Sequence, residues 1–218
     1  MGEMNDILRT ILVYALPVVF AITLHEAAHG YVARMFGDTT AYMMGRITLN
    51  PLKHIDIVGT VVVPLLLLAI TGGRFLFGWA KPVPVNFNNL RNPKRDMLWV
   101  AAAGPTSNML QALVWALLAK LLETASGVAA DYWGQVAVAG IFTNVVFAVL
   151  NLIPILPLDG GRVLASLLPR RASLAYQGTE RYGMIVLMLL IVTGILGRIM
   201  SPLINLAVAV IATLFGLQ

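Results

Sequence analysis

The chain has 218 residues, of which 59% are hydrophobic and only 11% are charged, and its mean hydropathy is +0.83. Soluble globular domains carry about 25% charged residues, so this composition excludes an ordinary soluble domain and indicates a lipid bilayer as the solvent. The formal net charge of +5 comes from Lys and Arg in short clusters between apolar runs, a pattern that favours loops at an anionic membrane face and argues against nucleic acid as a partner.

Apolar stretches, each bounded by Gly, Pro, Asn or charged residues, account for most of the chain. A helix needs roughly 20 apolar residues to cross ~30 Å of hydrocarbon. We therefore predict an all-α polytopic membrane protein, a single domain over residues 1–218, with about five to six transmembrane or re-entrant helical segments. The stretches are 7–36, 57–79, 97–122, 135–156, 183–200 and 202–216.

Two interruptions between the apolar stretches have sequences that favour extended backbone. Residues 41–54, AYMMGRITLNPLKH, combine β-branched residues with Gly and Pro, and residues 78–86, GWAKPVPVN, alternate Val and Pro. We predict short membrane-associated β-strands there, near the functional site. Non-helical backbone at membrane depth needs protein or water to satisfy its N–H and C=O groups, so such strands are expected to line a substrate groove.

The distribution of basic residues predicts the orientation of the first helix. Its N-terminal end is acidic and weakly basic, whereas Arg34, Arg46 and Lys53 follow its C-terminal end, which the positive-inside tendency places in the cytoplasm. For residues 57–79, a re-entrant hairpin keeps the next basic cluster, at 91–95, on the same side. A full crossing by this stretch stays open as the alternative.

The segment HEAAH at residues 25–29 carries the clearest chemical signal. His25 and His29 lie four residues apart, so one helical face presents both imidazoles to one Zn²⁺, and Glu26 lies beside them as a candidate general base. Each charged group in an apolar helix costs roughly 2–3 kcal/mol to insert, which favours a functional cluster over a chance match. Because the chain has no cysteine, a metal has only His and carboxylate ligands available.

A catalytic zinc needs a third protein ligand and one open position. His54 is the one remaining histidine and follows the NPLK turn. Asp159 ends an apolar helix, after Pro157 and before a pair of glycines that permits a tight turn. We favour the Asp159 carboxylate as the third ligand, and His54 stays a candidate for ligation or for contact with a substrate.

Three segments together resemble the motifs of the site-2 protease family of intramembrane zinc metalloproteases: HEAAHG at 25–30, AGPTSN at 103–108 and NLIPILPLDGG at 151–161. An HExxH segment alone is a weak signal, but an apolar one followed at this distance by an N-x-x-P-x-x-PLDG motif is highly specific. The resemblance covers most of the chain and points to the compact members of the family, which lack a PDZ domain.

The resemblance implies a role for each motif residue. His25, His29 and Asp159 are the expected ligands of one zinc ion per chain, and Glu26 is the expected general base. Asn151 is expected to contact the substrate or the oxyanion, with a helix-to-helix hydrogen bond as the alternative role, because polar side chains in bilayers commonly make one.

Asn108, in the AGPTSN segment, is expected either to line the site and contact substrate or to bond a neighbouring helix. The activity that the resemblance implies is hydrolysis of peptide bonds in or near transmembrane segments of membrane-bound proteins. The active site is expected near the cytoplasmic side of a prokaryotic cell membrane, in a multi-pass protein surrounded by the lipid bilayer. Two other functions stay open: a membrane transporter of divalent metal ions, and an inactive member that binds substrate without cutting it.

Overall fold

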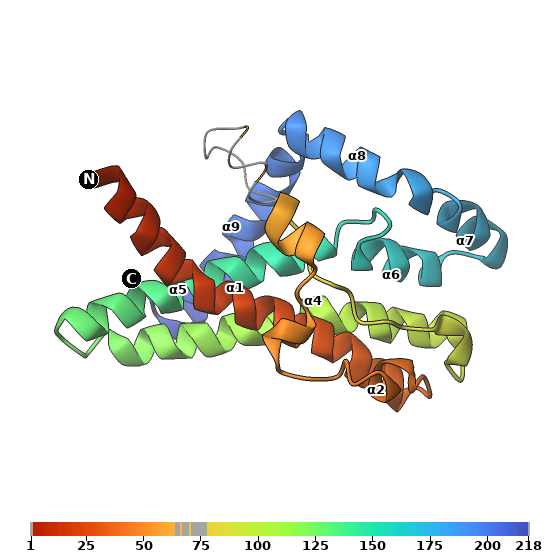
Figure 1. Cartoon of the computed structure of the whole chain (residues 1–218), viewed down its shortest axis with the longest axis horizontal. Helices are drawn as coiled ribbons and strands as arrows, with labels where there is room; N and C mark the ends of the chain where they lie inside the picture. Colours follow the sequence, from red (N-terminus) through yellow and green to blue (C-terminus); the bar gives the residue numbers. More distant parts are fainter. Residues whose placement is uncertain (1, 64–65, 67–69, 71–77, 218) are drawn as a thin grey trace.

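The computed structural model describes residues 2–217 except 64–65, 67–69 and 71–77, and every regular element in these residues is a helix (Figure 1). The all-α class predicted from the composition is confirmed. The α-helices are α1 (Gly2–Met35), α2 (Thr40–Met43), α4 (Pro93–Leu122), α5 (Val128–Asn151), α6 (Asp159–Leu167), α7 (Arg170–Gln177), α8 (Glu180–Val192) and α9 (Ile195–Phe215). Shorter helical turns are η1 (Pro51–Lys53), η2 (Ile57–Val62) and η3 (Phe87–Asn89).

The centre of the fold is the antiparallel pair α4 and α5, which α1 crosses and against which α9 packs (Figure 1). Small residues fill the contact between these helices. They let the helix backbones approach closely, which is the main source of packing energy where lipid removes the hydrophobic drive between helices. The buried cluster consists of Ala112, Ala116, Ala119, Ala137, Ile141, Val145 and Ile211.

Three helices of the described part are long and apolar enough to cross a membrane, judged by length and composition: residues 8–35 of α1, α5 and α9. The helix α4 is not among them although it has 30 residues, because polar side chains between Thr106 and Gln111 lower its hydropathy. The predicted five to six spans are therefore not confirmed. The hairpin expected at 57–79 falls mostly on residues outside those described.

The last two apolar stretches divide at a different residue from the one predicted. The prediction places the boundary next to Pro202, but α8 ends at Val192 and α9 begins at Ile195. Gly194 has a φ of +71°, in the left-handed region that stops a helix. Pro202 lies inside α9, where it removes one hydrogen-bond donor without ending the helix. The left-handed glycine, and not the proline, sets this boundary.

The two segments predicted to contain β-strands, 41–54 and 78–86, contain no strand in the structure, and their extended-looking parts, 46–50 and 82–86, are irregular backbone. In the second segment the cause lies in the composition itself. Pro82 and Pro84 favour extended backbone, but neither has an N–H to donate to a β-ladder. The predicted strands are therefore not confirmed.

Residues 81–86, called the strap below, contact α1 through Val83 and are held at both ends by hydrogen bonds. Arg46 donates from Nη2 to the first two backbone oxygens of the strap, at 3.0 and 3.2 Å. The first backbone N–H of the strap donates to the backbone oxygen of His54 at 2.9 Å, and the last, that of Asn86, donates to Oδ2 of Asp38 at 2.7 Å. Hydrogen bonds from side chains, together with isolated backbone hydrogen bonds, thus take the place of a β-ladder.

Asp38 joins the end of α1 to the strap. It is fully buried, and Oδ1 accepts hydrogen bonds from the N–H of Thr40 at 3.0 Å and from Nδ2 of Asn89 at 3.2 Å, in addition to the bond from Asn86. Burial raises the pKa of Asp38, but the hydrogen bonds from its partners outweigh burial and hold the pKa below its usual value. The carboxylate is therefore ionised at neutral pH, and both of its oxygens accept hydrogen bonds.

We expect Asp38→Ala to lower the free energy of unfolding in detergent by about 1–3 kcal/mol, because buried donors of the strap and of α2 lose their acceptor. Since the folded pKa lies below the unfolded one, the contribution of Asp38 is present at neutral pH and is lost as the pH falls through the folded pKa. Denaturant unfolding at several pH values measures both effects. The exposed Asp131→Ala is the control, and equal stability of the two variants would contradict the role given to Asp38.

Candidate metal centre

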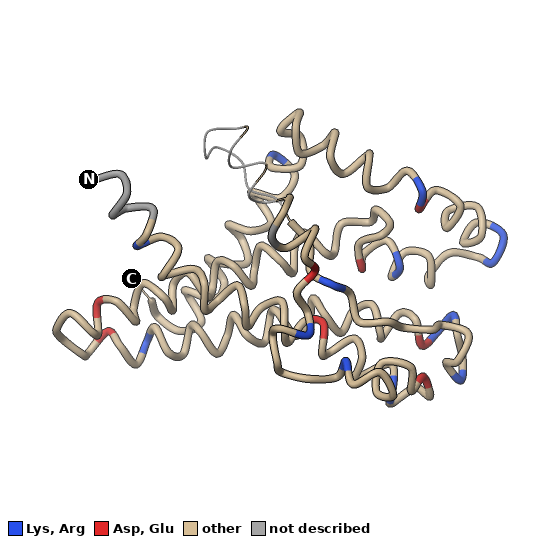
Figure 2. The backbone as a smooth tube through the Cα atoms, in the orientation of Figure 1, with Lys and Arg blue, Asp and Glu red and all other residues tan. Residues whose placement is uncertain are grey.

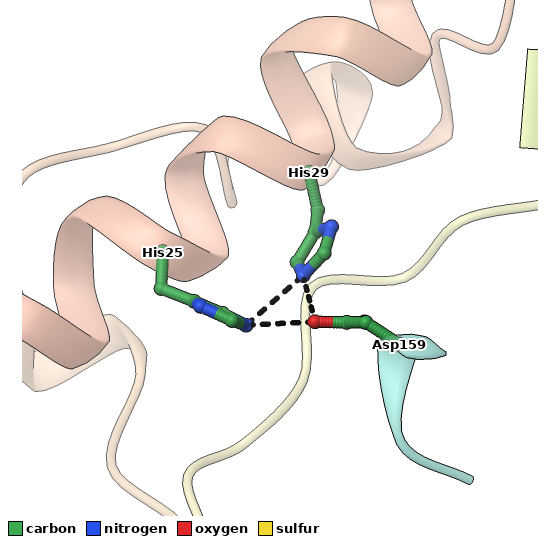
Figure 3. Close-up of side chains that lie close together, drawn as sticks. All are labelled: His25, His29 and Asp159. Carbon is green, nitrogen blue, oxygen red and sulfur yellow. Dashed lines mark hydrogen bonds and ion pairs between the residues drawn. The ribbon is translucent and has the colours of Figure 1, made fainter. Parts of the chain in front are cut away.

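The two histidines predicted to bind metal project from one face of α1, and Asp159 meets them from the first turn of α6 (Figure 3). Nε2 of His25 lies 3.1 Å from Nε2 of His29. Oδ2 of Asp159 lies 3.2 Å from Nε2 of His25 and 3.3 Å from Nε2 of His29. One atom from each residue therefore borders a common point, although α6 is far from α1 in the sequence.

Glycines allow Asp159 to reach this point. A Cβ on Gly160 would lie 2.2 Å from the backbone oxygen of Leu152, and a Cβ on Gly161 would lie 2.6 Å from the backbone nitrogen of Leu156. These neighbours are backbone atoms of the turn between α5 and α6, so they cannot move aside cheaply. Any side chain at either glycine would displace the start of α6, and the carboxylate of Asp159 with it.

A third glycine lies directly against the two imidazoles. A Cβ on Gly104, in α4, would lie 2.4 Å from Nε2 of His29 and 2.6 Å from Nε2 of His25. These are the two nitrogens that point to Asp159. The glycine of the AGPTSN segment therefore provides the space in which the ligand atoms converge.

An oxygen on the far side of each imidazole sets its orientation. Nδ1 of His25 lies 2.6 Å from Oδ1 of Asn108, and Nδ1 of His29 lies 2.7 Å from the backbone oxygen of Val100. Both partners are acceptors, so each ring carries its proton on Nδ1 and turns the lone pair of Nε2 toward Asp159. An outer acceptor of this kind is the usual companion of a metal-binding histidine.

The site consequently brings three acceptors together, two imidazole nitrogens and one carboxylate oxygen. Within the described residues, Oδ2 of Asp159 is buried and receives no hydrogen bond. The three ligand atoms lie within 4.8 Å of one another, so their lone pairs repel unless a cation lies among them. Two His and one Asp make a ligand set suited to a catalytic zinc, which keeps a fourth position open. The residues fit a zinc ion.

Glu26 is the next residue after His25, but its carboxylate lies outside the three-atom cluster. Its Oε2 accepts a hydrogen bond from the backbone N–H of Val83, in the strap, at 2.7 Å. The side chain is half-buried, and Oε1 takes no part in that bond. The strap therefore fixes the orientation of a carboxylate one residue away from a candidate metal ligand.

The structure brings Asn108 to the histidines and leaves His54 apart from them. Asn108 is fully buried and bonds the protein itself. His54 is 2% exposed, and its Nε2 donates to the backbone oxygen of Thr48 at 3.0 Å. The residue that completes the cluster of possible ligands is Asp159, not His54. Contact of Asn108 or His54 with a substrate stays a prediction.

Asn151 points to its own helix. Its Nδ2 donates to the backbone oxygen of Phe147, one turn earlier in α5, at 3.0 Å. To serve an oxyanion, this amide would have to turn away from Phe147. Its proposed contact with the substrate or the oxyanion stays a prediction.

Sequence reasoning missed two contributors to the site. The backbone oxygen of Val100 orients His29, and no side-chain pattern signals such a bond, because every residue has this oxygen. Asn144 is fully buried in α5 and bonds Asn108. A signal for Asn144 was available, because a polar side chain in the middle of an apolar helix needs a partner inside the protein.

Comparison with known proteins also points to a zinc metalloprotease. The model of the family described as "Peptidase family M50" matches residues 121–194, a range that includes Asp159. The chain is 37% identical over 192 residues to "Putative zinc metalloprotease YwhC" of Bacillus subtilis, which covers 86% of this chain and 84% of that protein. It is 30% identical over 181 residues to "Putative zinc metalloprotease Rip2" of Mycolicibacterium smegmatis, over 83% of this chain and 66% of that protein. No solved structure matches at a significant level.

Apolar helices around a His–His–Asp centre, together with these relatives, define a membrane metalloprotease that uses zinc. The chain belongs to peptidase family M50, the site-2 protease family. The resemblance based on its three motifs is thereby confirmed.

We expect Gly104→Ala to reduce zinc affinity by about 100-fold or more, beyond the upper end of the effect of losing an outer-shell partner, because the methyl group would occupy the space of both Nε2 atoms. Zinc per chain after dialysis against a chelator measures the loss. Gly134→Ala, in α5, is the matched control, because a Cβ there meets nothing within 4 Å. Full zinc retention by Gly104→Ala would show that the ligands do not converge as described.

Proposed function

We propose that the protein is an intramembrane zinc endopeptidase that hydrolyses peptide bonds in or next to transmembrane segments of membrane-bound substrate proteins, as in regulated intramembrane proteolysis. The observation that carries this proposal is the convergence of Asp159, from α6, on His25 and His29, which lie with Glu26 in a helix apolar enough to cross a membrane. A metal centre with two ligands on a membrane-spanning helix is suited to substrates that also lie in the bilayer.

In the proposed reaction, His25, His29 and Asp159 hold one zinc ion. When bound, zinc supplies Lewis acidity, which favours ionisation of water and polarises a carbonyl group. Glu26 takes the proton of the attacking water and delivers it to the nitrogen of the leaving peptide. The amide of Asn151 stabilises the negative charge on the former carbonyl oxygen after turning from Phe147.

The strap is the proposed binding element for the scissile segment. A helical substrate hides its carbonyl groups in its own hydrogen bonds, so it must unwind before a peptide bond reaches Glu26. The backbone N–H of Val83 already bonds Glu26, which places the strap beside the base. An extended substrate segment that pairs with strap backbone, or with residues 46–50, would therefore lie next to the catalytic groups.

The proposed orientation is multi-pass, with the active site near the cytoplasmic side of a prokaryotic cell membrane. Figure 2 shows Lys and Arg gathered at the end of the molecule that holds the C-terminal end of α1, the N-terminal end of α4, and the helices α6 and α7. Cytoplasmic loops carry an excess of these residues. This distribution supports the proposal that the end with Asp159 and the C-terminal turns of α1 faces the cytoplasm.

Cleavage of a single-span membrane protein by purified enzyme in liposomes tests the proposal. We expect Glu26→Gln to lower the cleavage rate by about 10²–10⁴-fold, the usual contribution of a general base, while zinc stays near the wild-type content. Asp159→Ala is expected to lose both cleavage and zinc, because only two ligands remain.

Glu123→Gln, at an exposed ion pair with Lys120, serves as the control for removal of a carboxylate. Cleavage by Glu26→Gln at the wild-type rate would refute the assignment of the base. Zinc flux into the liposomes that persists in Glu26→Gln, without cleavage by the wild type, would support a metal transporter instead.

A further inference from the structure

Behind His25, two buried asparagines on neighbouring helices form a continuous chain of hydrogen bonds. Asn108 lies in α4 and Asn144 in α5, and both side chains are fully buried. Oδ1 of Asn108 lies 2.6 Å from Nδ1 of His25, and Nδ2 of Asn108 donates to Oδ1 of Asn144 at 2.9 Å. Nδ2 of Asn144 donates in turn to the backbone oxygen of Gly140 at 2.9 Å. The chain of bonds runs from the backbone of α5 to a metal ligand.

We propose that Asn144 and Asn108 form a relay that fixes the ring orientation and the tautomer of His25, so that Asn144 is a positioning residue for zinc although it is two hydrogen bonds away from the metal ligand. This inference rests on the proposed zinc function of the site. It adds two residues whose role is to prepare the ligand, and neither of them is among the three residues whose ligand atoms converge.

The backbone oxygen of Gly140, at the end of the relay, determines which group donates in each of its hydrogen bonds. The backbone oxygen of Gly140 only accepts, so Asn144 must turn its NH₂ group toward Gly140 and its oxygen toward Asn108. Asn108 then faces two acceptors, Oδ1 of Asn144 and the backbone oxygen of Ala21, at 2.9 and 3.1 Å. Both need an NH₂ donor, so the oxygen of Asn108 is left for His25.

The result at His25 follows from this direction. An oxygen opposite Nδ1 requires the proton on Nδ1, which leaves the lone pair of Nε2 free for a metal. If the amide of Asn108 were reversed, its NH₂ group would oppose Nδ1 and favour the proton on Nε2, the tautomer that cannot bind zinc through that atom. Asn144 opposes this reversal because its own oxygen accepts from Nδ2 of Asn108.

His29 has no such dependence. Its Nδ1 faces the backbone oxygen of Val100, which cannot reverse. The two histidines therefore achieve the same tautomer by different means, one through backbone and one through two side chains. Buried amides are costly in apolar helices unless they are bonded, and these two are bonded at both ends.

Zinc affinity of the purified full-length protein, measured by competition with a chromophoric chelator, tests the relay. We expect Asn108→Leu to weaken zinc binding by about 10–100-fold, the usual effect of losing an outer-shell partner, and Asn144→Leu to weaken it in the same direction by less. In the double variant, Asn144→Leu is expected to add no further loss, because the relay is already broken at Asn108.

Two comparisons separate positioning from helix packing. Asn108→Asp keeps an oxygen opposite His25 whichever way the side chain turns, but it loses the donor to Asn144 and Ala21, so it is expected to retain more zinc affinity than Asn108→Leu. Thr143→Val, which removes a buried polar group next to Asn144, is expected to leave zinc affinity unchanged. If Asn108→Leu does not fold, Asn108→Ala carries the same test, with helix content and thermal unfolding recorded for every variant.

Unchanged zinc affinity in the Leu variants would overturn the relay, as would losses of affinity that are additive in the double variant. In either case the two amides would serve only to hydrogen-bond neighbouring helices. The proposed protease function fails in a different way, by the absence of substrate cleavage from zinc-loaded wild type. Because zinc affinity is measured without substrate, the two failures are distinguishable.

Discussion

Inside a bilayer, a polar group that finds no partner in the protein has none at all, and this constraint organises the molecule around α1. The helix carries His25, Glu26 and His29 in its long apolar stretch, and each of them has a partner from another part of the chain. Among the described residues that meet at the two imidazoles, the buried atom without a hydrogen bond is Oδ2 of Asp159, and the three acceptors there fit a divalent cation.

The groups that contact the polar side chains of α1 come from three different elements. The helix α4 supplies the oxygens behind the imidazoles, α6 supplies the carboxylate in front of them, and the strap supplies a backbone N–H beside them. Glycines and alanines let these elements come close enough, since a single methyl group on Gly104 would fill the centre. In this fold the polar groups can reach their hydrogen-bond partners only because small residues let the helices pack closely.

Much of the fold and of the site could be predicted from the sequence, and the exceptions have physical causes. Composition alone gave the helical membrane class, and spacing gave His25 and His29 on one face. The strands were expected because alternating Val and Pro favours extended backbone, but proline also deletes the donors that a ladder needs. The bond between Asn108 and Asn144 depends on how two helices are rotated against each other, which a single sequence does not encode at any one residue.

Pro82 and Pro84 have a further consequence for the way the strap is seated. They flank Val83, so three successive residues of the strap offer a single N–H, and that N–H is bonded to Glu26. If the strap slipped along α1 by one residue in either direction, a proline nitrogen without hydrogen would face the carboxylate, and the bond would be lost. The same prolines that prevent a β-ladder therefore exclude the two adjacent registers of the strap against α1.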